Sequence, residues 1–569
     1  MKKRTFLPQD YSIQTWSELQ PYYDTLVAKD ISTKANFELF LEQLSELESV
    51  VSEDLAWKYI KMTCDTTNKA LEESYIDFVT NIQPNIAPYD DQINHKIANS
   101  EYNFTLGESQ DYLIYFRYIN NAIKLYREEN IPIQAELQTL AQKYGSITGS
   151  LSVTIDGNEL TLQQASNFLK ETDRTKRKAA YEIINDKRYS VRDELNELFN
   201  QLIEKRHLVA TNTGYSNFRD YMHQAMGRFD YTVQDCYNFH DAIAQKVVPL
   251  CKELDIARKN SMQLETLKPY DMAVDPENKT PLKPFTDGKD LLEKSILCLN
   301  KVEPQFAENL RIMAEKGFLD LESRLGKAPG GYNYPLAESG IPFIFMNAAG
   351  SLRDVETMVH EAGHAMHSFL SEPLKLNAFK NAPMEVAEVA SMAMELISME
   401  GWDAFFSNPE DLKRAKIEQL EGVISTLPWI ATIDAYQHWL YTNPKHTNEE
   451  RTVAWIGIAK RFDTGVTDMT GYENYYANSW QKQLHLFEVP FYYIEYGFAQ
   501  LGAIAIWRNV LMNKKDGLDA YKNMLSLGYT RTIPELYKAG KVEFNFTPEY
   551  VGELFDFVWA ELEKLKHLS

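Results

Sequence analysis

The sequence predicts a mostly α-helical protein with one small β-sheet. Long stretches in both halves of the 569 residues repeat apolar side chains every three or four positions, which is the period of an amphipathic helix. Patterns typical of strands are few and short. Hydrophobic residues make up 44% of the chain and charged residues 25%, a composition that can form a large core and is unlike that of a disordered protein.

The N-terminal third is expected to be almost entirely helical. Residues 32–69 and residues 111–144 are each predicted to form a long amphipathic helix. Residues 151–155 alternate apolar and polar side chains and are followed by Asp156 and Gly157, a pair typical of a tight hairpin turn. We therefore expect a short β element there, after which the helical pattern resumes.

The second half begins with a break in the helical pattern. Residues 267–287 are rich in proline and irregular, and helices are expected again over residues 289–316. Residues 341–347 read IPFIFMN and are predicted to form a short strand. From residue 352 to the C-terminus the pattern is again helical, with breaks at several prolines and at Gly471.

Charge and cysteine usage limit the possible partners and compartments. The net charge of −22 argues against nucleic acid or an anionic membrane as the main partner. Residues 1–14 lack the apolar core of a signal peptide, and no stretch reaches the roughly 20 apolar residues of a membrane span. The scattered cysteines form no CxxC pair and are expected to be reduced, mostly structural thiols, so the protein is expected to be cytoplasmic. They are Cys64, Cys236, Cys251 and Cys298.

Residues 359–367 read VHEAGHAMH and contain the pattern HExxH. His360 and His364 are four residues apart, so on a helix both imidazoles project from one face and can bind one Zn²⁺ ion. Glu361 is rotated away from that direction and can act as the general base of a metalloprotease, in which the ion lowers the pKa of a water molecule and the carboxylate takes its proton. The alternative is a surface helix whose polar face holds histidines by chance. Apolar residues form a stripe on the opposite side, namely Val355, Val359, Ala362, Met366 and Phe369.

A catalytic zinc site needs a third protein ligand. The metzincin pattern HExxHxxGxxH is excluded because His367 and Leu370 stand where that pattern requires glycine and histidine. We expect His367 to be a polar neighbour of the site rather than a ligand.

Residues 384–400, MEVAEVASMAMELISME, offer the best third ligand. This predicted helix is apolar on nearly all sides yet carries three acidic residues, Glu385, Glu388 and Glu395, and buried carboxylates are costly unless they are paired or bind a metal. Glu388 and Glu395 share a face, so one could bind zinc while the other orients a ligand histidine. Glu385 is the one expected to point to solvent if any does, but spacing alone does not choose among the three.

A third stretch, residues 483–500, reads QLHLFEVPFYYIEYGFAQ. With Pro490 in the first turn of a helix, Tyr493 and Tyr496 would share a face. Their phenols could donate hydrogen bonds to the oxyanion of a hydrated peptide bond, and His485 could do the same. The alternative is that these aromatic residues only pack in the core.

The three stretches together resemble a known family. HEAGHAMHSFLS at residues 360–371, EVAS at residues 388–391 and HLFEVPFYYIEY at residues 485–496 resemble the M3 family of thimet oligopeptidase-like peptidases. Within that family the sequence is similar to the bacterial oligoendopeptidase F and Pz-peptidase branch. The resemblance is specific from about residue 330 to residue 500 and looser over the helical N-terminal half.

The resemblance implies a mostly α, two-lobed metallopeptidase fold with a deep channel and a small β-sheet beside the HExxH zinc helix. We expect residues 1–190 to form an N-terminal helical lobe and residues 191–569 a catalytic lobe. An edge strand at residues 343–347 would pair with extended peptide, and the glycine-containing loop at residues 330–334 would cover the cleft.

The resemblance also implies roles for individual residues. Glu388 matches the third ligand of one zinc ion per chain. His485, Tyr493 and Tyr496 match residues that take part in substrate and transition-state binding, with Tyr492 as a lesser competitor for Tyr493.

These observations predict a zinc endopeptidase that hydrolyses internal bonds of short oligopeptides by metal-activated water, with a monomer favoured. One alternative is a metallocarboxypeptidase on a related helical HExxH fold, which would need a cation for the terminal carboxylate of its substrate. Arg353, Arg461 and Lys482 could supply that cation. A second alternative, a helical binding scaffold with a decayed site, conflicts with the intact set of predicted site residues.

Overall fold

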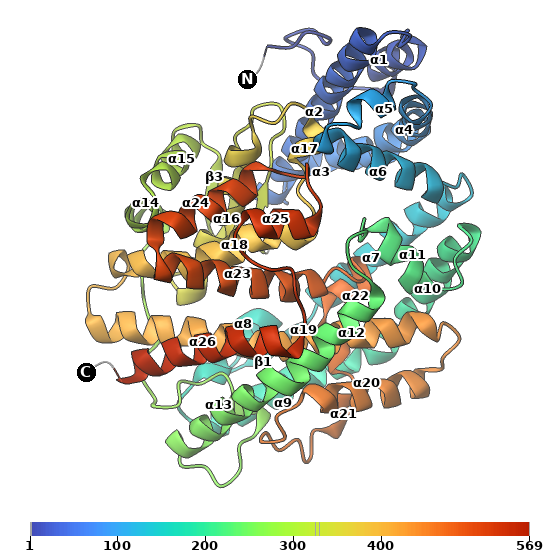
Figure 1. Cartoon of the computed structure of the whole chain (residues 1–569). Helices are drawn as coiled ribbons and strands as arrows, with labels where there is room; N and C mark the ends of the chain where they lie inside the picture. The colour runs from blue at the N-terminus through green and yellow to red at the C-terminus, as the bar shows by residue number, and fades with distance from the viewer. Residues whose placement is uncertain (1–2, 325, 329, 568–569) are drawn as a thin grey trace. The chain divides into compact units, whose positions relative to one another are not determined.

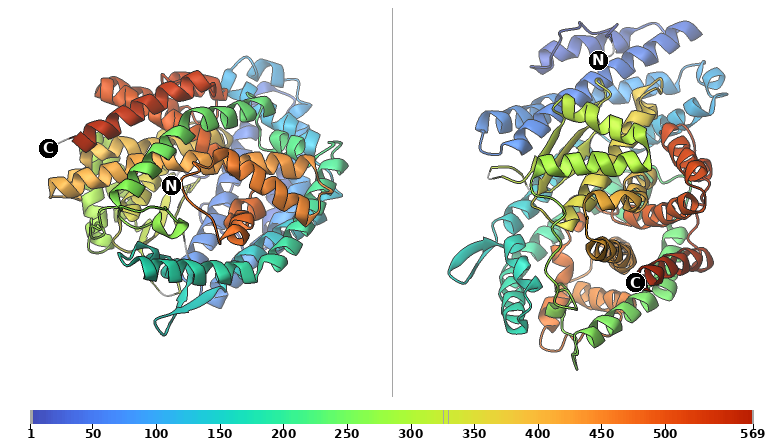
Figure 2. Two further views of the ribbon diagram at one scale, coloured as in Figure 1. Left: turned by 90° about the horizontal axis from the view of Figure 1, so that it is seen from below. Right: turned by 90° about the vertical axis from the view of Figure 1, so that its left-hand side faces the viewer.

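The computed structural model describes residues 3–567 except residues 325 and 329, and it is built mainly from helices, as predicted (Figures 1 and 2). These helices group into two compact units, each formed from separate segments of the chain. The first unit comprises residues 1–124, 282–416 and 498–544, and the second comprises residues 125–281, 417–497 and 545–569. The predicted boundary at residue 190 falls inside the second unit, and the division into an N-terminal and a catalytic lobe stays a prediction.

The first unit contains the N-terminal helices and the HExxH helix. Its helices are α1 (Trp16–Ala28), α2 (Lys34–Cys64), α3 (Lys69–Asp77), α4 (Gln83–Ala98), α5 (Asn103–Leu106), α6 (Gln110–Leu125), α14 (Gly288–Val302), α15 (Pro304–Glu315), α16 (Leu352–Ser371), α17 (Asn377–Lys380), α18 (Met384–Ser398), α24 (Lys514–Ser526) and α25 (Ile533–Ala539). A continuous apolar core joins α1, α2, α4 and α6, with Phe37, Phe40 and Phe78 among its fully buried side chains.

The second unit contains most of the remaining helices. They are α7 (Asn130–Gly149), α8 (Leu162–Ser166), α9 (Arg174–Ser190), α10 (Arg192–Asn212), α11 (Phe218–Ala225), α12 (Val233–Ala242), α13 (Val248–Ser261), α20 (Asn448–Phe462), α21 (Glu473–Ala477), α22 (Leu484–Glu488) and α26 (Pro548–His567). Two long helices, α19 (Pro409–Thr442) and α23 (Ile494–Met512), have residues in both units. Short 3₁₀ and π turns complete the helical structure at η1 (Phe78–Ile82), η2 (Asn167–Lys170), η3 (Ile243–Val247), η4 (Pro269–Asp271), η5 (Met399–Ala404) and η6 (Ser479–Lys482).

The predicted hairpin is confirmed. Strands β1 (Ser152–Ile155) and β2 (Asn158–Thr161) pair antiparallel across the two-residue turn of Asp156 and Gly157, and they appear as the teal arrows in Figure 2. Both turn residues have positive φ, 52° and 82°, which is the conformation that matches the twist of a two-stranded hairpin.

The prediction of one helix over residues 111–144 is wrong. Helix α6 ends at Leu125 and α7 begins at Asn130. Pro132 lacks the amide hydrogen that an interior helix residue donates, so it suits the first turn of a new helix. The Asn130 side chain fixes the start of α7, since its amide donates hydrogen bonds to the Val209 carbonyl and the Thr213 hydroxyl at 3.1 Å each.

The three-stranded sheet lies in the first unit and corrects a second expectation. Its order is β3 (Leu319–Glu322), β5 (Phe343–Ala348), β4 (Tyr332–Tyr334), with β5 parallel to β3 and antiparallel to β4. The strand predicted at residues 343–347 is therefore central and not an edge strand. Its side chains are buried on both faces, which is typical of a strand with partners on either side. Edge strand β4 comes instead from the glycine-containing loop.

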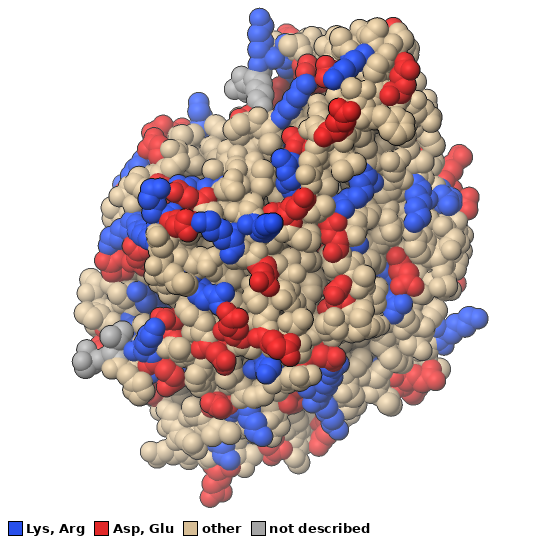
Figure 3. Space-filling view, in the orientation of Figure 1, with Lys and Arg blue, Asp and Glu red and all other residues tan. Residues whose placement is uncertain are grey.

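Two properties of the composition, the cysteines and the charged residues, can be followed in the structure. All four cysteines are free thiols, and Cys236, Cys251 and Cys298 are buried. Acidic and basic side chains are interspersed on the face in Figure 3, which has no broad area of one sign. Within the described part of the chain, none of the helices combines the length and the apolarity that a membrane span requires.

Helix α16, which carries the HExxH pattern, packs on α18 at backbone distance. A Cβ atom at Gly363 would lie 2.5 Å from the Ala390 carbonyl oxygen and 2.6 Å from the Ser391 Cα, so only glycine permits this approach. The predicted apolar stripe of α16 is buried, except that Phe369 is only partly buried.

We predict that Gly363→Ala destabilises the protein. The added methyl group must push α18 away from α16, and overpacking of this kind costs about 1–3 kcal/mol. Urea denaturation would measure the change in the free energy of unfolding.

A matched control is Gly457→Ala in α20, where nothing lies within 4 Å of the added methyl group. Alanine is the better helix former, so this variant should be as stable as the parent or more stable by up to about 1 kcal/mol. Equal stability of the two alanine variants would contradict the close contact at Gly363.

Candidate active site

His360 and His364 lie one turn apart on α16, and Glu388 faces them from α18. The Oε2 atom of Glu388 is 3.6 Å from Nε2 of His360 and 3.6 Å from Nε2 of His364. The three donor atoms all lie within 4.8 Å of one another. Ligands about 2.0–2.2 Å from a tetrahedral ion are themselves ~3.4 Å apart, so these side chains are spaced to fit a small divalent cation.

Hydrogen bonds orient two of these three groups. Glu395 Oε1 lies 2.7 Å from Nδ1 of His360, which leaves Nε2 directed towards Glu388. The Ser391 hydroxyl donates to Oε2 of Glu388 at 3.2 Å. The sequence left open which of Glu388 and Glu395 would be a metal ligand and which would orient a ligand histidine. The structure brings Glu388 to both Nε2 atoms and Glu395 to the far side of the His360 ring.

The alternative in which Glu385 points to solvent does not hold. Its side chain is buried, since α18 is covered along almost its whole length. The hydroxyl of Tyr537 in α25 donates a hydrogen bond to the Glu385 carbonyl oxygen at 3.1 Å, so this turn of α18 packs against protein.

Glu361 is also buried, and it belongs to the turn of α16 that faces the three-stranded sheet. The Asn333 side chain in β4 donates a hydrogen bond to the Glu361 carbonyl oxygen at 3.3 Å. A Cβ atom at Gly331 would lie 3.3 Å from Cγ2 of Thr357 and 3.9 Å from Oε1 of Glu361, so the backbone of the glycine-containing loop runs close to this turn of α16. Burial raises the pKa of Glu361 to about 7, a value suited to accepting a proton near neutral pH.

The two histidines differ in protonation. Burial lowers the pKa of His364 to about 4, so this imidazole is neutral and ready to bind a cation. Burial acts to lower the pKa of His360 as well, but the hydrogen bond and charge of Glu395 raise it to about 9. Binding a cation at Nε2 of His360 therefore requires the release of a proton.

His367 does not belong to this group of donor atoms. Its ring is buried on α16, and its Nε2 atom has no hydrogen-bond partner among the described residues. Burial lowers the pKa of His367 to about 3, so the ring stays neutral.

His485, Tyr493 and Tyr496 contact one another in the second unit. The ring centre of His485 is 4.7 Å from that of Tyr493 and 6.0 Å from that of Tyr496, and the two phenol rings are 5.6 Å apart. Tyr492 is also close, at 6.2 Å from His485. The structure therefore brings these four aromatic side chains together, and it gives no reason to drop Tyr492.

The predicted helical turn at Pro490 is wrong, because α23 begins only at Ile494. Phe491 interrupts the turn with φ of 66°, in the left-handed region that non-glycine residues rarely adopt. Two buried side chains hold it there. Gln437 Oε1 accepts a hydrogen bond from the Phe491 amide at 2.6 Å, and Arg228 donates one to the Phe491 carbonyl at 2.5 Å.

Buried arginines hold the rest of this segment, and no sequence pattern predicts them. Arg206 donates to the Leu486 carbonyl at 2.8 Å and also to the Phe487 carbonyl. Arg228 forms an ion pair with Glu495 in addition to its bond to Phe491. Each arginine is more than 260 residues from its partner, so no local pattern could have revealed these contacts.

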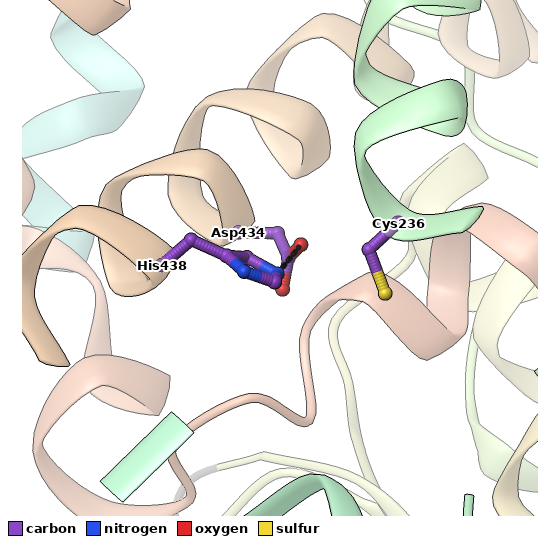
Figure 4. A group of neighbouring side chains, drawn as sticks. All are labelled: Cys236, Asp434 and His438. Atoms are coloured by element: carbon purple, nitrogen blue, oxygen red, sulfur yellow. Dashed lines mark ion pairs between the residues drawn. The ribbon is translucent and has the colours of Figure 1, made fainter. Parts of the chain in front are cut away.

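A second group of potential metal ligands in the described part of the chain is Cys236, Asp434 and His438 (Figure 4). Oδ2 of Asp434 lies 3.1 Å from Nε2 of His438 and 2.8 Å from Nε2 of His240. Both distances are shorter than the ~3.4 Å that separates ligands of a tetrahedral ion. Asp434 therefore forms a buried hydrogen bond with His240 and a close ion pair with His438, and the bond to His240 links α12 to α19. Although burial acts to raise it, the two histidines hold the pKa of Asp434 well below its usual range.

The sequence matches two family models. The model of Peptidase family M3 covers residues 167–553, and the model of the Peptidase M3 N-terminal domain covers residues 6–126. An oligoendopeptidase F homolog of Borreliella burgdorferi is 24% identical over 557 residues, which are 90% of this chain and 89% of that protein. Oligopeptidase PepF of Bacillus subtilis is 23% identical over 73% of this chain and 61% of that protein.

Solved structures show the same fold. PZ peptidase A, solved with an inhibitor, superposes with a TM-score of 0.90 at 24% identity, over 98% of this chain and 99% of that chain. Oligoendopeptidase F from Enterococcus faecium superposes with a TM-score of 0.65 at 15% identity, over 97% of each chain.

We predict that Glu395→Gln weakens the binding of a divalent cation roughly 10- to 100-fold, the usual effect of losing a carboxylate behind a ligand histidine. Glutamine keeps the shape and an acceptor oxygen but loses the negative charge beside Nδ1 of His360. Competition with a chromogenic chelator would measure the affinity.

The control is Glu400→Gln, which removes a carboxylate that pairs with Lys514 at 2.7 Å on the surface. Its affinity for the cation should equal that of the parent protein. An unchanged affinity in Glu395→Gln as well would remove Glu395 from the site.

Proposed function

The chain belongs to peptidase family M3, and we propose that the metal on which it depends is one zinc ion per chain, held by His360, His364 and Glu388. As a member of the oligoendopeptidase F branch of that family, the protein is a metallo-endopeptidase that acts on oligopeptides. The observation that carries the zinc proposal is the donor set. Two imidazoles on α16, each with Nε2 at 3.6 Å from one carboxylate oxygen on α18, form the typical ligand set of a catalytic zinc site.

We propose Glu361 as the general base. When bound, zinc acts as a Lewis acid towards water and the substrate carbonyl. The Glu361 carboxylate accepts a proton from the attacking water molecule and then donates it to the leaving amine, so that the broken C–N bond ends as a carboxyl group and an amine. Burial favours this role, because it raises the basicity of the carboxylate.

We propose that His485, Tyr493 and Tyr496 bind the substrate and the oxygen on which negative charge develops. An imidazole N–H and two phenol O–H groups are suitable donors to such an oxygen. Their ring contacts support the idea that they act as one group. Whether Tyr492 shares this role, and whether a deep channel surrounds the site, stay predictions.

The carboxypeptidase alternative is not supported, because the curated relatives are oligoendopeptidases. The three candidate cations also have other partners: Arg353 pairs with Glu356 at 3.0 Å, Arg461 pairs with Asp241, and the Lys482 amine lies 4.5 Å from the centre of the Trp429 ring. We further propose a cytoplasmic monomer that binds short peptides and no nucleic acid. Four free cysteines suit a reducing compartment.

We predict that a chelator abolishes cleavage of a mixed peptide library and that zinc restores it. Mass spectrometry of the products should show cuts at internal bonds, with peptides blocked at either terminus still cleaved. His360→Ala and His364→Ala should lose stoichiometric zinc, because each removes one of three ligands. A variant that keeps tightly bound zinc and full turnover would remove that histidine from the ligand set.

We predict that Glu361→Gln keeps zinc but loses most turnover, since an amide cannot accept the proton of the attacking water. General base catalysis is typically worth about 100- to 10,000-fold. Zinc content and kcat would be measured on the same preparation, with Glu400→Gln as the control of unchanged activity. Turnover within roughly tenfold of the parent would show that another group is the base.

A further inference from the structure

The His485 ring is fixed by a chain of two hydrogen bonds that begins at a tryptophan. The indole nitrogen of Trp429 in α19 donates to Oε1 of Gln483 at 2.9 Å. The Nε2 atom of Gln483 then lies 2.7 Å from Nδ1 of His485. All three residues belong to the second unit.

The chemistry of these groups determines the direction of both bonds. An indole N–H can only donate, so it must meet the oxygen of the Gln483 side chain and not its nitrogen. The NH₂ group of Gln483 therefore faces His485, and an NH₂ group also can only donate. Nδ1 of His485 must then be the acceptor, which places the proton of the neutral ring on Nε2.

The same glutamine contacts the second member of the aromatic group. Burial raises the pKa of Tyr493, and a hydrogen bond from Gln483 acts in the opposite direction. The bond to Nδ1 makes His485 a donor from Nε2, and Gln483 also lies next to Tyr493.

We propose that Trp429 and Gln483 are positioning residues that hold neutral His485 in the tautomer with its proton on Nε2, from which it donates a hydrogen bond to the developing oxyanion of the substrate. This inference rests on the proposed role of His485 in transition-state binding. It adds that the donor is a neutral imidazole. The position of its proton is set by Trp429, 56 residues away in the sequence, through the hydrogen bond from the indole to the side chain of Gln483.

The decisive variant is Gln483→Glu. A carboxylate only accepts, so it pulls a proton onto Nδ1 of His485. At low pH the ring is then an imidazolium that still donates from Nε2. As the pH rises, the imidazolium loses its Nε2 proton, because Nδ1–H is held by the carboxylate, and the donor disappears. Titratable groups in ring contact with His485 include the phenols of Tyr492, Tyr493 and Tyr496.

We therefore expect kcat of Gln483→Glu to match that of the parent at low pH and to fall about 100-fold at high pH, the usual effect of losing one oxyanion donor, with little change in KM. Gln483→Met removes the hydrogen bond without reversing it and should lower kcat without this new pH dependence. Trp429→Phe keeps an aromatic ring but releases the amide, and it should behave like Gln483→Met. Zinc content and thermal unfolding would establish that each variant is folded.

The tautomer can be observed without substrate. Long-range ¹H–¹⁵N correlation spectra of protein labelled at its 11 histidines distinguish a protonated from an unprotonated ring nitrogen, and His485→Gln identifies the signal. We expect the proton on Nε2 in the parent and on Nδ1 in Gln483→Glu at high pH. A proton on Nδ1 in the parent overturns the proposal. A reversed tautomer with unchanged kcat also overturns it, while the zinc endopeptidase function is judged separately by chelation and Glu361→Gln.

Discussion

At Gly363 the HExxH helix lies close enough to α18 for backbone to meet backbone, and the positions of four site residues follow from that contact. His360 and His364 are separated by one turn of α16, and Glu388 and Glu395 by two turns of α18. Once the crossing point is set, α18 presents Glu388 to both Nε2 atoms and Glu395 to Nδ1 of His360. A larger residue at the crossing would move both carboxylates at once.

This arrangement concentrates charge where water is largely excluded. Glu361 and Glu388 are buried and Glu395 is only slightly exposed, and burying an uncompensated carboxylate costs several kcal/mol. A divalent cation held by the proposed ligands would offset that cost, since it would supply two positive charges at the point where the donor atoms converge. Metal binding and folding would then be coupled, and the stability of the first unit would depend on free metal concentration.

Residues close together in sequence carried most of the correct predictions. The helix pattern, the hairpin at Asp156 and Gly157 and the HExxH pattern depend on neighbours within a few positions, so periodicity reveals them. The break in the helix predicted over residues 111–144 also has a local cause, Pro132, but the other expectations that failed depend on distant partners. Glu385 is covered by α25, residues 343–347 acquire a strand on either side, and Phe491 is held left-handed by Arg228 and Gln437. Trp429 and Gln483 belong to no sequence motif. The role of such a single residue becomes visible only when the fold places it beside its partner.

The buried cysteines give each unit of the fold its own reporter of local opening. Cys298 lies in the first unit, whereas Cys236 and Cys251 lie in the second. Burial raises the pKa of the Cys298 and Cys251 thiols to about 12, and alkylating reagents attack only an accessible thiolate. Modification must then wait for transient exposure of the thiol, so its rate reflects the opening equilibrium of the surrounding helices. Peptide mapping of alkylated sites would thus give separate opening free energies for the two units, with and without zinc, from native cysteines alone.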